Sequence, residues 1–190
     1  MEKNNSKLRW TYFPNTRKID NHLLDVVRVF EDNFEAIDSQ MQNAEKGNAM
    51  DSNTVLSIIS EQLKDAGYEV EKGKRKEDKI HIPVLYGENG IAEKSFDADA
   101  YSCENKTVIE VEAGRAVANY QFLKDFFEAS VMDDVDYLCI AVRQYYAVKS
   151  NSVGKFTISK DYEEVCKFFN TMYLSRKYTP SLKGILIIGY

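Results

Sequence analysis

Apolar residues recur at steps of three and four positions in several stretches of the chain, which is the spacing of one helical face. The first stretch spans residues 17 to about 41 and predicts one long amphipathic helix. A second helix is predicted over residues 54–66, with its N-cap within residues 51–53. Similar patterns in AVANYQFLKDFFEASVM, residues 116–132, and DYEEVCKFFNTMYLS, residues 161–175, predict two more helices.

Between the second and third predicted helices the pattern changes to the alternation of half-buried strands. YEVEKGK and KIHIPVLYG predict strands, and SFDADAY and TVIEVEA predict a hairpin around SCENK. Near-continuous apolar runs in VDYLCIAVRQYYAV and KGILIIGY predict strands that are covered on both faces. The order helix, β-meander, helix, strand, helix, strand predicts an α/β fold with a mixed β-sheet flanked by helices. We expect residues 1–50 to form an N-terminal helical extension and residues 51–190 to form the α/β core.

Composition excludes some classes of protein. The 190 residues are 44% hydrophobic and carry a formal net charge of −5, which argues against disorder and against a strongly basic coat that binds nucleic acid. Cys103, Cys139 and Cys166 are widely spaced and predict reduced thiols in a cytoplasmic protein. No run approaches the ~20 apolar residues of a membrane span, so no membrane association is expected. No glycine-rich phosphate loop is present, so no nucleotide cofactor is expected.

The predicted hairpin holds acids at two-residue spacing within otherwise strand-like runs. Residues i and i+2 of a strand face the same side, so Asp97 and Asp99 share one face and Glu110 and Glu112 share another. A turn centred on CENK would place Asp99 opposite Glu110 and Asp97 opposite Glu112, with Cβ atoms roughly 5 Å apart. Such a patch is repulsive unless a cation neutralises it. Mg²⁺ is bound by one or two carboxylates with waters and phosphates, so we expect a magnesium phosphodiesterase site.

A simpler interpretation is that the alternation reflects one strand face in contact with water. It fits isolated acids well, but TVIEVEA lies between apolar elements and runs directly into a helix through Gly114. Two further residues are candidates for the site, although each could instead be an exposed surface residue. Glu61 lies on the helix before the sheet, where it could aim at the metal, and Gln121 lies near the start of the third helix, where it could order the site or the DNA backbone.

A basic segment, KGKRK, is predicted on a loop between two strands. Its cations could contact phosphates, although a solvated charge run is an equal alternative; they are Lys72, Lys74, Arg75 and Lys76. His22 and His81 have no partner at ligand or triad spacing, and we expect both to be structural or solvent-facing.

The hairpin resembles the PD-(D/E)xK nuclease superfamily. An Asp, a hairpin of about ten residues, an apolar triplet and then Glu-x-(acid or Lys) entering a helix is the pattern of that superfamily, and the order of elements from residue 53 to 190 resembles its restriction-endonuclease-like core. VIEVE is most similar to the BamHI/BglII-type variants, in which the usual Lys of the motif is replaced, in one case by Glu.

The resemblance implies roles for individual residues. Asp99, or alternatively Asp97, would be the first metal-binding Asp, and Glu110 would be the second ligand. The Val111 carbonyl would supply a third oxygen. Glu112 stands where most members have Lys, so it could bind metal or accept a proton from the attacking water, but it supplies no positive charge. Nearby cations that could supply that charge, each with a surface role as its alternative, are Arg115, Lys124 and Lys106.

The expected function is Mg²⁺-dependent hydrolysis of DNA by a restriction-type endonuclease, with Mn²⁺ able to substitute. Arg115 and Gln121 are expected to contact DNA together with the basic segment. DNA is the expected partner, and a homodimer is expected from the resemblance. Two alternatives stay open. One is a catalytically impaired nucleic-acid-binding protein of the same fold, and the other is an α/β protein-interaction domain.

Overall fold

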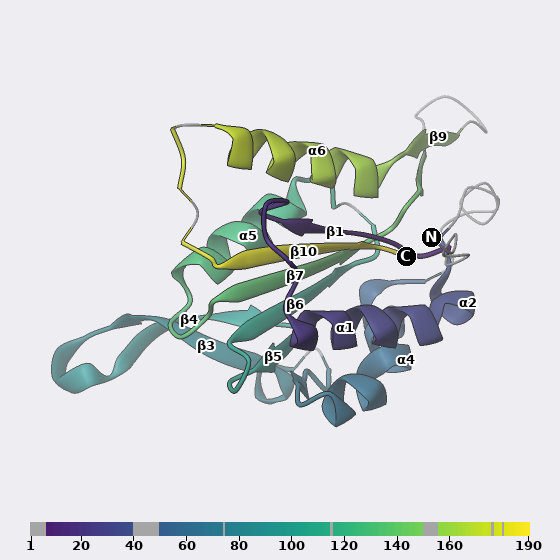
Figure 1. Ribbon diagram of the computed structural model, residues 1–190. Coiled ribbons are helices and arrows are strands. Elements are labelled where there is room, and N and C mark those ends of the chain that lie inside the picture. The colour runs from purple at the N-terminus through teal and green to yellow at the C-terminus, as the bar shows by residue number, and fades with distance from the viewer. Residues whose placement is uncertain are drawn as a thin grey trace.

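A six-stranded mixed sheet forms the centre of the protein (Figure 1). The computed structural model describes residues 7–39, 50–73, 75–114, 116–149, 156–175, 177–179 and 181–190. The sheet has the order β1-β10-β7-β6-β5-β2. Its strands are β1 (Arg9–Phe13), β2 (Glu69–Val70), β5 (Ala100–Ser102), β6 (Thr107–Glu112), β7 (Tyr137–Val142) and β10 (Gly184–Gly189).

The three middle strands are parallel to one another and buried on both faces. β6 pairs with β7, and β7 pairs with β10, in parallel register. Every residue of β10 is buried, as the near-continuous apolar run predicted. The outer strands β1, β5 and β2 pair in antiparallel fashion. The predicted fold class, an α/β fold with a mixed sheet flanked by helices, is confirmed.

Helices cover both faces of the sheet, and alternate residues of each strand contact one layer or the other (Figure 1). In β6, Ile109 and Val111 belong to the core that contains α1 and α4, whereas Val108 belongs to the core that contains α5 and α6. The helices are α1 (Asn21–Asp32), α2 (Phe34–Ile37), α4 (Ser52–Asp65), α5 (Gln121–Val131) and α6 (Asp161–Leu174).

The long helix predicted over residues 17–41 is shorter and interrupted. Helix α1 begins at Asn21 and ends at Asp32, and α2 follows after Asn33. The Asn33 backbone leaves helical geometry (φ −100°, ψ 4°), and its side-chain amide donates to the Val29 carbonyl at 2.8 Å. Asn competes for backbone groups in this way, which explains the break inside a periodic apolar pattern. The predicted end of the helix near residue 41 lies outside the described residues.

The first fifty residues also contribute a strand that the periodicity did not predict. Strand β1 pairs antiparallel with β10, from Arg9 opposite Gly189 to Phe13 opposite Ile185. Tyr12 and Phe13 are buried, on opposite faces of the sheet. The described part of the N-terminal segment is therefore joined to the sheet through β1, and the division of the chain at residue 50 stays a prediction.

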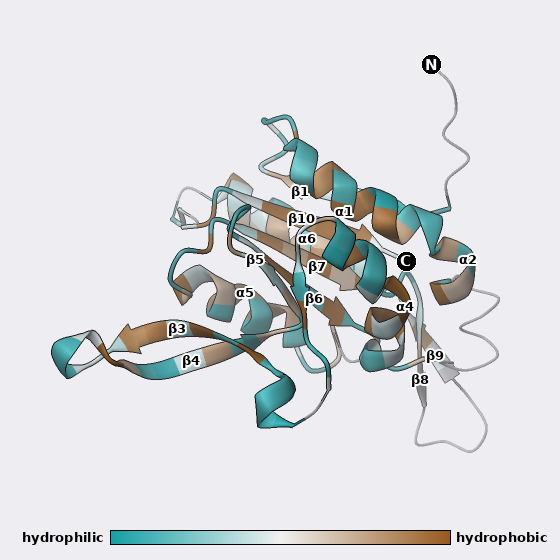
Figure 2. Cartoon of the chain, turned by 90° about the horizontal axis from the view of Figure 1, so that it is seen from below, coloured by the Kyte–Doolittle hydropathy of each residue, from teal (hydrophilic) through white to brown (hydrophobic). Residues whose placement is uncertain are grey.

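Two small ribbons lie outside the central sheet. Strands β3 (Ile80–Tyr86) and β4 (Ala92–Ala98) form an antiparallel pair that projects from the body of the protein (Figure 2). The tip of this ribbon exposes Leu85 and Ile91. Strands β8 (Tyr146–Lys149) and β9 (Phe156–Ser159) form the second ribbon. The expected hairpin is thus divided, because β4 leaves the sheet and only β5 pairs with β6.

Two other predicted elements are shorter than their apolar patterns. The helix predicted over residues 116–132 begins at Gln121, because turns precede it and Tyr120 adopts a left-handed conformation (φ 53°). The strand predicted over residues 135–148 breaks between β7 and β8 at the buried polar residues Arg143 and Gln144. Among the described residues, no helix has both the length and the apolar character needed to cross a bilayer.

Candidate active site

Strand β6 presents two acids to the helix layer that contains α5. Glu110 and Glu112 alternate with the buried Val111, so they share the face of Val108, which packs in the core beneath α5 and α6. The strand alternation predicted from TVIEVEA therefore holds. The face is only partly open to water, because both glutamates are half-buried, and they lie at the end of β6 that leads toward α5.

Asp99 lies in the single-residue gap between β4 and β5. Its carboxylate Oδ2 accepts a hydrogen bond from the Val111 backbone N–H at 2.8 Å. Ala100 pairs with Ile109, so one step further along the same register Asp99 faces Glu110, as the sequence predicted. The amide of Val111 thus fixes the orientation of the Asp99 carboxylate. The role expected for the Val111 carbonyl, as a metal ligand, stays a prediction.

Asp97 is not brought to the same place as Asp99. It lies in β4 and pairs with His81 of β3, not with Glu112. Its carboxylate is 2.7 Å from His81 Nδ1, and its side chain is 52% exposed. His81 is exposed and engaged with this aspartate, which agrees with the solvent-facing role expected for it. The structure therefore brings Asp99 to Glu110 and Glu112 and leaves Asp97 on the ribbon.

Helix α5 adds an acid and a cation to this group. Asp125 is 4% exposed, and its Oδ2 atom is buried without a hydrogen-bond partner among the described residues. Lys124 is adjacent in the helix and donates a hydrogen bond to Glu128 at 3.0 Å. Because α5 packs against β6, Lys124 lowers the pKa values of both glutamates of that strand, and Asp125 raises the pKa of Glu110.

The acids raise one another's pKa values. Burial is the main cause in each case, and it raises the pKa of Asp99 to about 6, that of Glu112 to about 7 and that of Asp125 to about 8. Burial also raises the pKa of Glu110 well above its ordinary value, with Asp99 and Asp125 adding to the effect. The Lys124 ammonium lowers all these pKa values, so it is the cation that this group shares.

A second charged pair borders Asp99. The backbone N–H of Glu71, just after β2, donates to the Asp99 carbonyl at 2.9 Å. The Glu71 side chain is 4% exposed and accepts a hydrogen bond from Lys79 at 2.5 Å. Glu71 raises the pKa of Asp99 and Lys79 lowers it. This ion pair therefore sits beside the acids at the edge of the sheet.

The arrangement fits a divalent cation bound by few protein ligands. Within the described part of the chain, no three His, Cys, Asp or Glu side chains are placed so that together they could hold a metal ion. Mg²⁺ does not need three, since it is commonly held by one or two carboxylates with waters and substrate phosphates. Buried carboxylates with raised pKa values and an unpartnered carboxylate oxygen on Asp125 are the groups that a cation would satisfy.

The remaining predicted residues lie elsewhere or outside the described residues. Glu61 is 84% exposed on α4 and forms an ion pair with Lys64 at 2.7 Å, and it is not among the charges that shift the pKa values of the acidic group. Gln121 is the first residue of α5. Lys74 and Arg115 lie outside the described residues.

The basic segment lies between β2 and β3, on the loop that the sequence predicted. Arg75 is engaged with Asp78 at 3.0 Å and with Glu77 at 3.5 Å. The Lys76 carbonyl is 3.0 Å from His81 Nε2. Lys72 has no ion-pair partner among the described residues.

Sequence reasoning missed Asp125, Glu71 and Lys79. For Asp125 a signal was present, because its position lies on the apolar face that Phe122, Phe126 and Ala129 define at three- and four-residue steps. An acid on that face must be buried when the helix packs. Glu71 and Lys79 gave no comparable signal, since their proximity to Asp99 depends on the pairing of β2 with β5.

No protein-family model matches this chain. No curated protein matches it either. Among solved structures, the chain is similar to the restriction endonuclease BglII in its crystal structure complexed with a DNA 16-mer. The similarity covers 96% of this chain and 75% of that chain, with 12% sequence identity and a TM-score of 0.47.

Proposed function

We propose that the protein is a Mg²⁺-dependent endonuclease of restriction-endonuclease-like fold that hydrolyses phosphodiester bonds in DNA. The observation that carries the proposal is the convergence of Asp99, Glu110 and Glu112 beside the Lys124 ammonium. The motif in which these acids lie resembles the PD-(D/E)xK pattern, and their geometry agrees with its division of roles.

Asp99 and Glu110 are the residues that would hold the cation. The Val111 N–H keeps the Asp99 carboxylate turned toward Glu110, so the two acids are positioned before any ligand arrives. When bound, Mg²⁺ would polarise the phosphoryl oxygen and stabilise the leaving oxygen. Mn²⁺, which also suits oxygen ligands, should substitute for it.

Two residues would take the roles near the phosphate that belong to the motif lysine in most members of the superfamily. They are Glu112 and Lys124. Glu112 would accept a proton from the attacking water as the new phosphorus–oxygen bond forms and the bond to the leaving oxygen breaks. Its pKa of about 7 suits a base that works near neutral pH. Lys124 is the cation that lowers the pKa values of all four acids, and it would offset negative charge on the phosphate.

Cleavage of supercoiled plasmid DNA in Mg²⁺ tests the proposal. We expect nicked and linear DNA from the wild-type protein and a loss of at least about 100-fold in rate for Asp99→Ala and for Glu110→Ala. Asp97→Ala is the matched control, because it removes the same group two residues away, and it should retain the wild-type rate. Loss of cutting in Asp97→Ala but not in Asp99→Ala would reverse the assignment.

The same assay distinguishes the alternatives. Retention of DNA without cutting by the wild-type protein would favour a catalytically impaired nucleic-acid-binding protein. Neither DNA binding nor cutting would favour a protein-interaction domain. A homodimer stays a prediction, and the molar mass in solution, measured by light scattering, tests it.

A further inference from the structure

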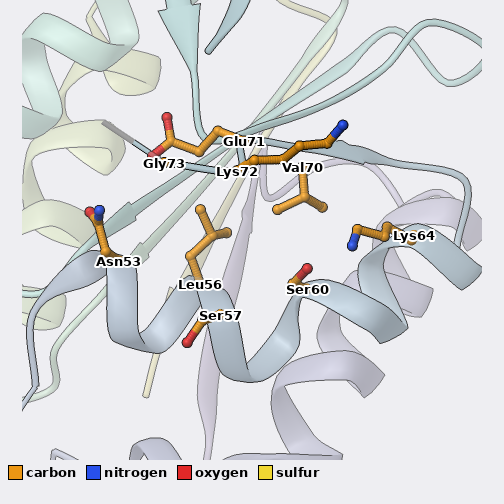
Figure 3. A pocket seen from close by; sticks show the side chains of 9 residues that line it. All are labelled: Asn53, Leu56, Ser57, Ser60, Lys64, Val70, Glu71, Lys72 and Gly73. Atoms are coloured by element: carbon orange, nitrogen blue, oxygen red, sulfur yellow. The ribbon is translucent and has the colours of Figure 1, made fainter. Parts of the chain in front are cut away.

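A cavity of about 280 Å³ with both polar and apolar lining residues lies between α4 and the segment that follows β2, at the edge of the sheet (Figure 3). We call it the α4 groove and define it by its lining residues, Asn53, Leu56, Ser57, Ser60, Lys64, Val70, Glu71, Lys72 and Gly73. Strand β2 is an edge strand of the six-stranded sheet, and among the described residues no further strand pairs with its outer side. The groove runs along this edge.

The groove and the acidic group meet at Glu71, at the edge of the sheet, because α4 and the acids lie on opposite faces of the sheet. Glu71 lines it, and the Glu71 backbone N–H is bonded to the Asp99 carbonyl. A chain of linked phosphates that reached the acids could therefore continue into the groove. In Figure 3 the Glu71 carboxylate lies toward Asn53, and the ends of the Lys64 and Lys72 side chains lie at the opposite end of the groove.

The lining suits a phosphate rather than a base. Its lining includes two lysines, two serines and an asparagine beside one carboxylate, Glu71, which is already paired with Lys79, and none of the lining residues is aromatic. Bases of single strands are held by stacking on aromatic side chains, whereas phosphates are held by Lys, Ser and Asn side chains. The volume of about 280 Å³ lies just below the range of roughly 300–1,000 Å³ for small-molecule pockets.

The two lysines are available to a ligand. Lys72 has no ion-pair partner among the described residues, whereas Arg75 and Lys79 of the same loop are bonded to acids. Within the described part of the chain, the only ion-pair partner of Lys64 is Glu61, which is 84% exposed. Such an exposed pair contributes little free energy, so an incoming phosphate can replace the carboxylate.

We propose that the α4 groove binds the sugar–phosphate backbone of DNA, through Lys72 and Lys64, next to the phosphate held at the acids. This inference rests on the proposed function for its choice of ligand. It selects Lys72 from the basic segment as the cation that contacts phosphate, and it adds residues of α4 that the sequence had not singled out.

Binding of fluorescent duplex DNA to the full chain in EDTA, followed by anisotropy over a range of salt concentrations, tests the groove. Lys72→Gln should weaken binding about fivefold near physiological salt and lower the slope of log K against log salt by about 1. The loss should be equal for two duplexes of unrelated sequence, because phosphates carry no base identity. Lys72→Arg should restore both the affinity and the slope.

Lys183→Gln is the matched control, since it removes one exposed charge just before β10, at the end of the parallel strands where β6 begins and away from Glu110 and Glu112. It should change neither quantity. Equal effects of Lys72→Gln and Lys183→Gln, or no binding of DNA at all, would overturn the groove. If the groove variants behave as expected but wild-type protein cuts no DNA in Mg²⁺, the endonuclease fails and the groove stands. If the protein cuts DNA in Mg²⁺ but Lys72→Gln binds DNA as tightly as wild type, the endonuclease stands and the groove fails.

Discussion

At the scale of single residues, Glu112 decides how the proposed reaction can work. It occupies the position at which a lysine is expected, and its carboxyl group is partly buried beside Asp99. Burial and that neighbour raise its pKa to about 7, so the group changes charge within the physiological range. A base near neutrality can accept a proton from water, which a protonated lysine cannot do.

The rate of DNA cutting should therefore follow the ionisation of Glu112. The carboxylate form is the active one, so the rate should rise with pH and level off above about 7. Glu112→Gln should lower the rate about 100- to 10,000-fold, the usual range for loss of a general base. Initial rates between about pH 5.5 and 8.5 measure both effects. A Glu112→Gln variant that keeps the wild-type rate would remove the base from the proposal.

Asp125 should link stability to pH. Its pKa is raised from 3.8 to about 8, so below about pH 4 it is protonated in both the folded and the unfolded state. Between these values the unfolded chain has lost the proton that the folded protein keeps, so the wild-type free energy of unfolding falls as pH rises. Asp125→Asn removes this dependence. Its stability relative to wild type should grow by up to about 1.4 kcal/mol per pH unit.

Urea unfolding of both proteins in EDTA, at several pH values from about 4 to 8, measures the difference. A constant difference across this range would show that Asp125 has no raised pKa in the folded state. Asp125→Ala is less informative, because it also opens space in the core beside Phe122 and Ala129.

The positions of some site residues could be predicted from the sequence, and those of others could not. The opposition of Asp99 and Glu110 follows from strand alternation and a short turn, both of which are local. The separation of Asp97 could not be predicted, because it depends on the pairing of β4 with β3 in place of β6. Asp125 could have been found from its apolar neighbours, but its partner acids lie on another element.

At the scale of elements, α4 supports one side of the candidate DNA surface. Its N-cap Asp51 accepts hydrogen bonds from the Thr54 backbone N–H at 2.8 Å and from the Thr54 hydroxyl at 2.7 Å. Val55, Ile59 and Leu63 bury one face of the helix, and Ser60 and Lys64 face the groove. The cap predicted within residues 51–53 is therefore confirmed at Asp51.

Removal of this cap should weaken the protein by a modest, measurable amount. Asp51→Ala should lower the free energy of unfolding by about 1 kcal/mol, since it leaves an N–H of the first turn without its side-chain partner. Asp51→Asn is the control, because Asn caps helices about as well as Asp. Thermal and urea unfolding measure the difference, and equal losses in the two variants would assign the effect to charge instead of the cap.

Elements were predicted best where one pattern ran from end to end. Helix α6 and strand β10 match their predicted ranges within a residue or two, because each is bounded by polar residues or turns. The prediction of one continuous helix over residues 17–41 was wrong at Asn33. The Asn33 side chain donates a hydrogen bond to the backbone there and α1 ends, although the apolar periodicity continues. Strand β1 has five residues and ends just before Pro14, so its alternation of apolar and polar residues was too short to predict a strand.

At the scale of the whole molecule, the acids lie where the sheet changes direction. β6 is parallel to β7 on one side and antiparallel to β5 on the other. Its parallel neighbours are covered by helices on both faces, whereas the β5–β2 side ends at the α4 groove. The site thus combines a rigid, buried strand with an accessible edge, which is the combination that a large charged substrate requires.

The position of β10 has a consequence for how the protein is made. This strand is the last of the sheet in sequence, yet it lies between β1, the first, and β7. Among the described strands β1 pairs with β10 alone, so its backbone stays unpaired until residues 184–189 have been synthesised. Tyr12 and Phe13, which are buried on opposite faces of the sheet in the folded protein, therefore lie on an unpaired strand edge until β10 has formed.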